Sequence, residues 1–506
     1  MDRSSGSIHL ASGSKVFLNQ AFTCCPYAAV ITSKIHDFFE ANRCEIVDEP
    51  ADAVLSVVNT CGFNASRSTQ AIKTIGVLRK MAPDSPLVVA GCLTRIEEQR
   101  VAEALAGAPA WLLVGPNDHR RFDELLPRLE RPFAEVQTNL YKDRYSSRDP
   151  RFGLYQVLVS IGCMNQCAYC VIRQAKGPVT SKPLEEVCRE VERGFELGYR
   201  DIFLVGDDIA SWGHDLGTDV VELLRALASI GTEGQYSAEA FEPSRLMPHL
   251  DALEDVFRSG RFAWLVVPVQ SGSDRLLRAM GRGYTRADAE RLVRRLKETA
   301  PEMILSTDFI FGFAEETRAE FDQSIELAQR FDYANFNEYE PRPGTPPLLV
   351  PESEMEHRRQ VVMEFLREQG SQVEVLTRNR NIPCEALMGA ENKSVGKVEP
   401  SPWVVEHAAV LQKRFEGDAS ELAEGWRVVE VKEDYQRVVL VVGHDEADEP
   451  LEFLVAERDP DTPCIAFSVD YNFGLIWEKE SACTLDAGQI KALEALKTRL
   501  DLQSES

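Results

Sequence analysis

Three cysteines, Cys163, Cys167 and Cys170, stand in a C-x3-C-x2-C spacing within the stretch SIGCMNQCAYCVIRQAKGPVTSKP, residues 160–183. Three thiolates on one short loop can hold three irons of a cubane [4Fe–4S] cluster. The fourth iron then lacks a protein ligand, and a small molecule can chelate it through an amino and a carboxylate group. No side chain can supply chemistry of this kind, so a cofactor would have to carry it.

Two other roles for these cysteines need to be weighed. A closed zinc site also uses thiolates, but it takes four ligands. The stretch from 140 to 187 contains no other Cys and no His that could be the fourth. Three buried cysteines that pack as small hydrophobic residues are the second alternative. The tight spacing favours the cluster over both.

The length and composition limit the number of domains, the location and the class of protein. At 506 residues the chain is expected to form about three domains. It has no run of eighteen apolar residues, and its polar start, MDRSSGSIHLASGSK, lacks the apolar core of a signal peptide. We therefore expect no membrane span and a cytoplasmic location. Twelve cysteines in such a chain indicate a reducing compartment and metal or catalytic roles.

Residues 1–130 are predicted to form a doubly wound parallel sheet, because apolar strands alternate with helical stretches. Three of the strands end at a cysteine: Cys25, Cys61 and Cys92. Ligands of such sheets lie beyond the carboxyl ends of the strands, so these thiols predict a second cluster site. Separate burial of the three is the alternative, since cysteine is often buried. Cys25 is preferred to Cys24 because Pro26 follows it and the strand ends there.

The next part of the chain returns to the same alternation after a polar linker at 131–150. Residues 151–374 contain about six strand–helix units, which predict a partial (β/α) barrel with its chemistry at the carboxyl rim. Polar side chains gather at these strand ends: Asp207, Asp208, Glu239, Glu242, Gln270, Ser271, Asp308, Glu338 and Glu340.

Residues 375–506 are predicted to form a mostly β domain of acidic character. Residues 374–506 hold 27 acidic and 14 basic residues, a net charge of −13, against −25 for the whole chain. Such a surface repels phosphate backbones, so a nucleic-acid partner is disfavoured.

The chain resembles the radical S-adenosylmethionine methylthiotransferases over about residues 15–350. Its C-x3-C-x2-C loop with Tyr169 is similar to the radical signature. The other similar segments are NTCGF (59–63), AGCLT (90–94), G-x3-S-K-P (177–183), LVGDDIASWGHDL (204–216), VPVQSGSDRLLRAMGRGYTR (267–286), STDFIFGF (306–313) and PRPGT (341–345). Residues 375–506 do not resemble the small TRAM domain in which the family commonly ends.

The resemblance implies two [4Fe–4S] clusters and S-adenosylmethionine as cofactors. Cys163, Cys167 and Cys170 would hold the cluster that cleaves S-adenosylmethionine, and Cys25, Cys61 and Cys92 an auxiliary cluster that carries sulfur. Contacts to S-adenosylmethionine are expected from these rim residues: Gly206, Asp207 and Asp208 near its amino group, Asp308 near the ribose, and Gly312 near the adenine.

The implied reaction inserts sulfur, as a methylthio group, at an unactivated C–H carbon. The expected substrate is a protein, peptide or small metabolite, and the expected electron donor is a flavodoxin or ferredoxin. A tRNA methylthiotransferase is the alternative within enzymes. A member that has lost turnover and serves as a cluster-binding partner is the alternative outside them.

Overall fold

The computed structural model describes residues 4–5, 8–21, 25–47, 49–126, 128–136, 154–197, 199, 201–231, 234–362 and 365, and the strands at 421–423, 426–434, 437–444, 451–459 and 462–468. The chain forms two compact units, residues 1–395 and 396–506. In the part of the chain that is described, no helix is long and apolar enough to cross a membrane.

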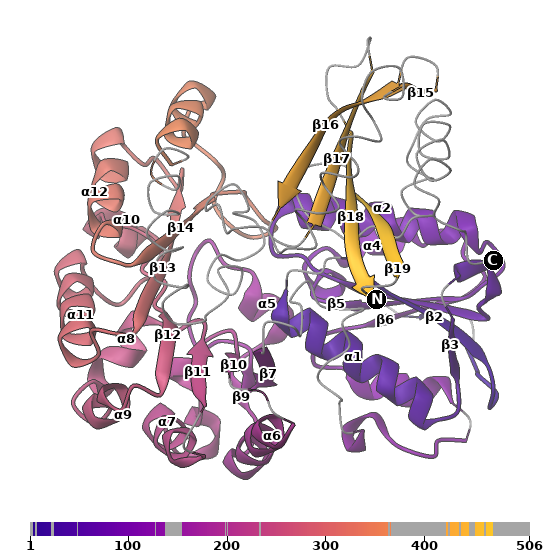
Figure 1. Ribbon diagram of the computed structural model, residues 1–506, viewed down its shortest axis with the longest axis horizontal. Helices are drawn as coiled ribbons and strands as arrows, with labels where there is room; N and C mark the ends of the chain where they lie inside the picture. The colour runs from indigo at the N-terminus through magenta and orange to yellow at the C-terminus, as the bar shows by residue number, and fades with distance from the viewer. Residues whose placement is uncertain are drawn as a thin grey trace. The chain divides into compact units, whose positions relative to one another are not determined.

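The first unit opens with a six-stranded sheet in the order β1-β6-β5-β4-β2-β3, parallel except for β1. Figure 1 shows helix α1 on one face of this sheet and helices α2 and α4 on the other. The elements are β1 Ser4–Ser5, β2 Lys15–Gln20, α1 Pro26–Ala41, β3 Glu45–Val47, β4 Leu55–Thr60, α2 Ala65–Met81, β5 Leu87–Gly91, α3 Leu93–Ile96, α4 Glu98–Ala104 and β6 Trp111–Val114.

The sheet forms where the sequence alternates apolar strands with helices. Strands β4 and β5 are buried at every position, as expected for central parallel strands covered on both faces. Pro26 occupies the first turn of α1, where a missing N–H costs nothing, and the Asn64 side chain caps α2 by accepting from Arg67 N–H. The run RRFDELLPRLE (120–130) has a sequence pattern that predicts a helix, but the chain there forms only a short 3-10 helix at His119–Leu125.

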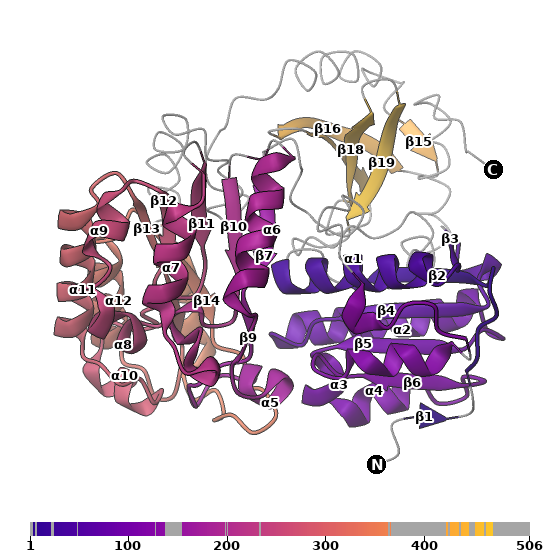
Figure 2. The ribbon, with the colours of Figure 1, turned by 90° about the horizontal axis from the view of Figure 1, so that it is seen from below.

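A second sheet of six parallel strands follows in the order β14-β13-β12-β11-β10-β7. Helices lie along its outer side, and Figure 2 shows α6, α7, α9 and α11 in this layer. The strands are β7 Leu154–Leu158, β10 Asp201–Val205, β11 Gln235–Ala238, β12 Phe262–Val266, β13 Ile304–Phe311 and β14 Tyr333–Glu338. The helices are α5 Ile172–Lys176, α6 Leu184–Glu196, α7 Val220–Ser229, α8 Pro243–Leu246, α9 Glu254–Arg258, α10 Asp274–Ala279, α11 Arg286–Thr299 and α12 Arg318–Ala328.

The second unit contains a five-stranded antiparallel sheet in which each strand pairs with the next along the chain. Its strands are β15 Glu421–Ala423, β16 Trp426–Asp434, β17 Arg437–His444, β18 Leu451–Asp459 and β19 Thr462–Ser468. In this part of the chain the sequence also predicts strands at CEALMG (384–389) and WVVEHAAVL (403–411) and a helix at AGQIKALEALKTRL (487–500), and all three lie outside the described residues. The predicted fold class is confirmed: a doubly wound sheet, a partial (β/α) barrel and a mostly β domain.

Candidate functional site

The first group of thiols, Cys25, Cys61 and Cys92, lies at one edge of the first sheet. Cys25 precedes α1 after β2, Cys61 follows β4 directly, and Cys92 follows β5 directly. The chain order reverses between β2 and β4, because β3 lies on one side of β2 and β4 on the other. Ligands of open parallel sheets sit at such a reversal. The sheet thus brings together the three cysteines predicted from the strand ends, while Cys24 lies outside the described residues.

Two glycines allow these strand ends to approach one another. Gly91 has a φ of +97°, and a Cβ at this position would lie 2.2 Å from the Thr60 carbonyl oxygen. A Cβ at Gly62 would lie 2.9 Å from Ile96 Cδ1. Only glycine gives a positive φ without strain and leaves room for the neighbouring backbone. The G-C pair at the end of β5 is therefore what places Cys92 beside the end of β4.

The thiols of this first group interact with one another. A hydrogen bond from Cys25 lowers the pKa of Cys61 to about 5, and the nearby charge of Arg67 adds to this effect. The same hydrogen bond and burial raise the pKa of Cys25 well above its usual value. Burial raises the pKa of Cys92 to about 12. One sulfur is thus favoured as a thiolate, and a bound metal would have to displace the protons of the other two.

The second group of thiols, Cys163, Cys167 and Cys170, lies on the loop between β8 (Ser160–Ile161) and α5. Each sulfur accepts one N–H hydrogen bond. Asn165 N–H donates to Cys163 over 3.4 Å and Ile172 N–H to Cys170 over 3.4 Å, while Arg282 Nη1 donates to Cys167 over 3.2 Å.

This donor set fits a cluster held by thiolates. Hydrogen bonds to the ligand sulfurs stabilise negative charge and tune the potential of iron–sulfur clusters. Burial raises the pKa values of Cys163 and Cys170 to about 12, so a metal would have to displace their protons. Arg173 fixes the loop by donating from Nη1 to the carbonyl oxygens of Cys163 and Met164, at 3.0 and 2.9 Å.

The two groups of thiols meet through α3 and α5. Ile96, Val171 and Ala175 form one buried cluster, and Cys92 packs against it. Beside it, Lys176 Nζ lies 2.7 Å from Asp207 Oδ1 and 3.6 Å from the centre of the Tyr27 ring. The charge of the same ammonium also acts on Cys25 and Cys92 of the first group. Residues of both sheets therefore surround one buried ion pair.

A second contact joins the two sheets beside Cys61. Arg342, in the segment PRPGT, donates to Gly62 O over 3.0 Å, to Ser68 Oγ over 2.6 Å and to Glu97 Oε1 over 2.5 Å. The side chains of Arg342 and Glu97 are only 4% and 5% exposed. Glu340 accepts from the Ala65 N–H at the start of α2 over 2.5 Å. These bonds fix the segment between Cys61 and Cys92 against the barrel.

The residues expected to contact S-adenosylmethionine fall into two sets. Asp208 and Asp308 are acidic groups at the strand ends of the barrel, and burial raises the pKa of each to about 6. Asp207 is already engaged, because it pairs with Lys176 and accepts from Gly162 N–H over 2.8 Å. Gly206 lies beside Ser160, and the Met355 side chain fills the side of Gly312 where a Cβ would lie, its Cε only 2.6 Å from that position. Asp208 is engaged as well, because its two oxygens accept from Ser211 Oγ and from Glu242 N–H. Asp308 is thus the member whose carboxylate best suits a bound ligand.

Sequence reasoning missed three side chains that the structure places at the site: Lys176, Arg282 and Arg342. Each lies in a segment already singled out, namely the radical loop, VPVQSGSDRLLRAMGRGYTR and PRPGT. A signal was present, because each is a basic residue in a segment with other marks of function. Their partners, however, are 31, 115 and 245 residues away in the sequence, so the contacts themselves had no local signature.

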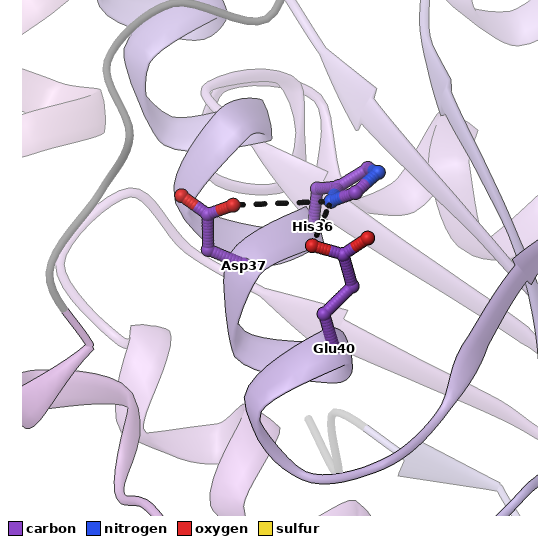
Figure 3. Close-up of side chains that lie close together, drawn as sticks. All are labelled: His36, Asp37 and Glu40. Atoms are coloured by element: carbon purple, nitrogen blue, oxygen red, sulfur yellow. Dashed lines mark ion pairs between the residues drawn. The ribbon is translucent and has the colours of Figure 1, made fainter.

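Another group of side chains close enough to share a cation lies on α1. His36 Nδ1 is 3.4 Å from Glu40 and 3.9 Å from Asp37, and Figure 3 shows all three on one helix. Each of the three also makes further interactions. We attribute the arrangement to contacts between neighbouring side chains of one helix.

The chain matches the Radical SAM superfamily over residues 157–328 and the Uncharacterized protein family UPF0004 over residues 20–112. It is 30% identical over 353 residues to the tRNA-2-methylthio-N(6)-dimethylallyladenosine synthase of Stutzerimonas stutzeri, a match covering 65% of this chain and 78% of that protein. It is also 30% identical over 308 residues to the probable threonylcarbamoyladenosine tRNA methylthiotransferase of Pyrococcus horikoshii, covering 60% of this chain and 71% of that protein.

Among solved structures, the radical S-adenosylmethionine methyltransferase of Kitasatospora setae with cobalamin and [4Fe-4S] cluster bound is 18% identical. That match covers 66% of this chain and 74% of that chain, with a TM-score of 0.46. The two family matches together contain all six cysteines of the two groups.

Proposed function

Because this chain belongs to the radical S-adenosylmethionine methylthiotransferase family, we propose that it inserts sulfur, as a methylthio group, at an unactivated C–H carbon. It is a radical enzyme whose cofactors are S-adenosylmethionine and [4Fe–4S] clusters. The observation that carries the proposal is that the two groups of cysteines adjoin each other: Cys92 packs against the buried cluster of Ile96, Val171 and Ala175, in which Val171 directly follows Cys170. Sulfur insertion requires two such sites that act on one substrate.

In this proposal each group of cysteines holds one cluster. Cys163, Cys167 and Cys170 would hold the cluster that binds S-adenosylmethionine, and Cys25, Cys61 and Cys92 would hold the auxiliary cluster. When bound, the two clusters and S-adenosylmethionine supply the substrate radical and the sulfur that it takes up. A flavodoxin or ferredoxin is the proposed electron donor.

The chain's own residues orient these groups. Arg282 and the N–H groups of Asn165 and Ile172 stabilise the three sulfurs of the second group. Gly206 and Asp208 are proposed to bind the amino group of S-adenosylmethionine, while Asp207 holds Lys176.

The remaining proposed contacts lie farther along the barrel rim. Asp308 accepts from Asn335 Nδ2 over 3.1 Å, which leaves its second oxygen for the ribose hydroxyls. The main chain at Gly312 is proposed to lie against the adenine.

The contact through Arg342 serves the same chemistry. A radical must be generated close to the sulfur that it will meet, and water must be kept away from it. Arg342 and Glu340 hold the segment between Cys61 and Cys92 against the barrel, so both groups of cysteines keep a fixed separation. This supports a reaction that uses both sites in succession.

For the substrate we propose a protein, peptide or small metabolite. The net charge of −25, of which −13 falls on residues 374–506, disfavours a phosphate backbone. The matches to the two relatives described above cover 60–65% of this chain, so part of it lies outside the region on which the likeness rests.

A tRNA adenosine is the second candidate, and a specific observation favours it. Phe63, two residues after Cys61, is 48% exposed, and the Arg67 guanidinium lies 5.1 Å from the centre of its ring. An exposed aromatic ring beside a cation is a common platform for an unstacked base. The two relatives named above are both described as tRNA enzymes.

The cluster count tests the proposal most directly. Iron and sulfide content and Mössbauer spectra would be measured on the anaerobically reconstituted wild type and on the Cys163→Ala/Cys167→Ala/Cys170→Ala variant. We expect about eight irons to fall to about four, and the remaining cluster to be lost on changing Cys61 and Cys92 to alanine. Four irons that fall to none would leave a single-cluster enzyme and overturn the auxiliary site.

The substrate is tested with the same preparation. Methylthio groups would be sought by mass spectrometry in digested tRNA and in the digested proteome after incubation with S-adenosylmethionine, sulfide and reductant. Incorporation into tRNA nucleosides alone would overturn the protein or small-molecule proposal. Absence of deoxyadenosine from every mixture would instead support a cluster-binding partner without turnover.

A further inference from the structure

Lys176 places a buried positive charge between the two groups of cysteines. Its side chain is 6% exposed, and its ammonium is paired with Asp207, which is 10% exposed. The main-chain oxygen of Lys176 accepts a hydrogen bond from the Asn117 side chain. The ammonium of Lys176 is therefore held by Asp207, which follows β10 of the barrel, and its backbone by Asn117, which follows β6 of the first sheet.

The two charges of this pair lie among thiols of both groups. The Lys176 ammonium lies over the ring of Tyr27, two residues after Cys25, and Cys92 packs against the buried cluster that contains Ala175, the neighbour of Lys176. The Lys176 charge works to lower the pKa of both thiols. The Asp207 carboxylate interacts with Cys92 and also with Cys170 of the second group. Burial works to lower the pKa of Lys176, but the Asp207 carboxylate beside it outweighs burial and the pKa is raised. The ion pair with Asp207 thus favours the charged form of Lys176.

Packing alone does not account for a charge here. Removing a lysine ammonium from water costs several kcal/mol unless partners compensate, and apolar residues of similar volume often serve the fold as well. A cation beside thiolates has a clear electrostatic effect, however. It stabilises every additional negative charge on the group that they bind, and the net charge around an iron–sulfur cluster is one of the determinants of its potential.

We propose that Lys176 is the counter-ion of the auxiliary cluster, raising its reduction potential and stabilising the anionic sulfur bound to it, while Asp207 limits the size of the effect. This inference rests on the proposed function, since it requires a cluster at Cys25, Cys61 and Cys92. Lys176 is a positioning residue for charge, and it takes no part in bond making.

The test measures the potential of that cluster in the full-length chain carrying Cys163→Ala, Cys167→Ala and Cys170→Ala, so that one cluster is observed. Redox titrations followed by electron paramagnetic resonance would compare Lys176→Gln, Lys176→Arg and Asp207→Asn. Lys182→Gln is the matched control, because Lys182 lies on the same segment and pairs with Glu190 at 2.6 and 2.7 Å.

We expect Lys176→Gln to shift the reduction equilibrium at least tenfold toward the oxidised cluster, which is about 59 mV for one electron. Asp207→Asn should shift it in the opposite direction, because the cation is then uncompensated. Lys176→Arg and Lys182→Gln should remain within tenfold of the parent chain. Opposite signs for the two members of the pair identify charge as the cause, since loss of structure has no reason to produce them.

Several outcomes overturn the inference. Equal potentials in Lys176→Gln and its parent would do so, as would shifts of the same sign in Lys176→Gln and Asp207→Asn. If Lys176→Gln takes up no iron, an unshifted Asp207→Asn still overturns it. Absence of iron from the parent chain itself would overturn the two-cluster function together with the role of Lys176. The iron content of the parent chain therefore distinguishes failure of the Lys176 inference alone from failure of both proposals.

Discussion

Replacing Arg342 with methionine should loosen the contact between the first sheet and the barrel without unfolding either. Methionine keeps most of the length and volume of the arginine but removes its charge and donors. The three hydrogen bonds to Gly62, Ser68 and Glu97 are lost together. The Glu97 carboxylate, 5% exposed, then keeps its charge without its buried partner.

The size of the effect follows from these contacts. Breaking a buried ion pair from one side costs about 3–5 kcal/mol. Arg100 also pairs with Glu97 but is 47% exposed, so it compensates only in part. We therefore expect the low end of the range, about 3 kcal/mol, in the free energy of opening this contact. That corresponds to roughly two orders of magnitude in the opening equilibrium.

Hydrogen–deuterium exchange of the reconstituted protein can measure this opening. Amides at the start of α2, around Ser68, should exchange about a hundredfold faster in Arg342→Met than in wild type. The matched control is Arg318→Met, which breaks the exposed pair of Arg318 with Glu354 (2.8 Å) and should cost less than about 1 kcal/mol. Glu97→Gln combined with Arg342→Met should recover part of the loss, because no buried charge is then left alone.

The functional consequence separates this reasoning from general destabilisation. Deoxyadenosine formation uses residues of the barrel and should stay within about threefold of wild type, while methylthio product should fall at least tenfold. The reasoning is wrong if deoxyadenosine and product fall in proportion, or if exchange near Ser68 is unchanged. An equal loss of protection in Arg318→Met would also contradict it.

Three further predictions concern single positions. Gly91→Ala forces a Cβ to within 2.2 Å of Thr60 O at a φ of +97°, a strain above about 1–2 kcal/mol. The iron content should therefore fall from about eight to about four per chain, and full iron content would contradict this. Arg282→Gln removes a charged donor from the Cys167 sulfur. In an anaerobic titration the cluster that cleaves S-adenosylmethionine should then show a more negative midpoint potential. An unchanged potential would argue against the contact. Burial raises the pKa of Asp308 to about 6, so this carboxylate is protonated as the pH falls through 6. Calorimetry should then show S-adenosylmethionine binding about three- to tenfold more weakly at pH 5.5 than at pH 7.5. In Asp308→Asn the binding constant should not change between these pH values. A sloped profile in that variant would assign the titration to another group.

One turn of the barrel holds an alanine in a strained backbone conformation. Ala314, in the turn GFAEET (312–317), has a φ of +53°, in the left-handed region. Such a residue costs roughly 1–2 kcal/mol. Alanine does not favour this conformation locally, so only the tertiary structure decided the geometry of this turn.

The strands, the helices and the placement of the cysteines at strand ends could be predicted from the sequence because their signals are local. Apolar runs of four to eight residues mark the buried parallel strands, and a cysteine directly after a strand must lie at the sheet edge. Cys61 and Cys92 follow this rule directly. The C-x3-C-x2-C spacing is likewise a property of one loop, so its chemistry could be inferred before any fold was known.

The tertiary structure alone decided how the two sites are joined. Lys176 meets Asp207, Arg282 meets Cys167, and Arg342 meets Glu97, over separations of 31, 115 and 245 residues. The first two pairs form within the barrel and the third forms where the first sheet packs against it, and a charged residue has many possible partners along a chain of 506 residues. Composition and spacing specify which groups can bind a cluster. The distances between buried charges, which fix how two clusters influence each other, exist only once the sheets have packed.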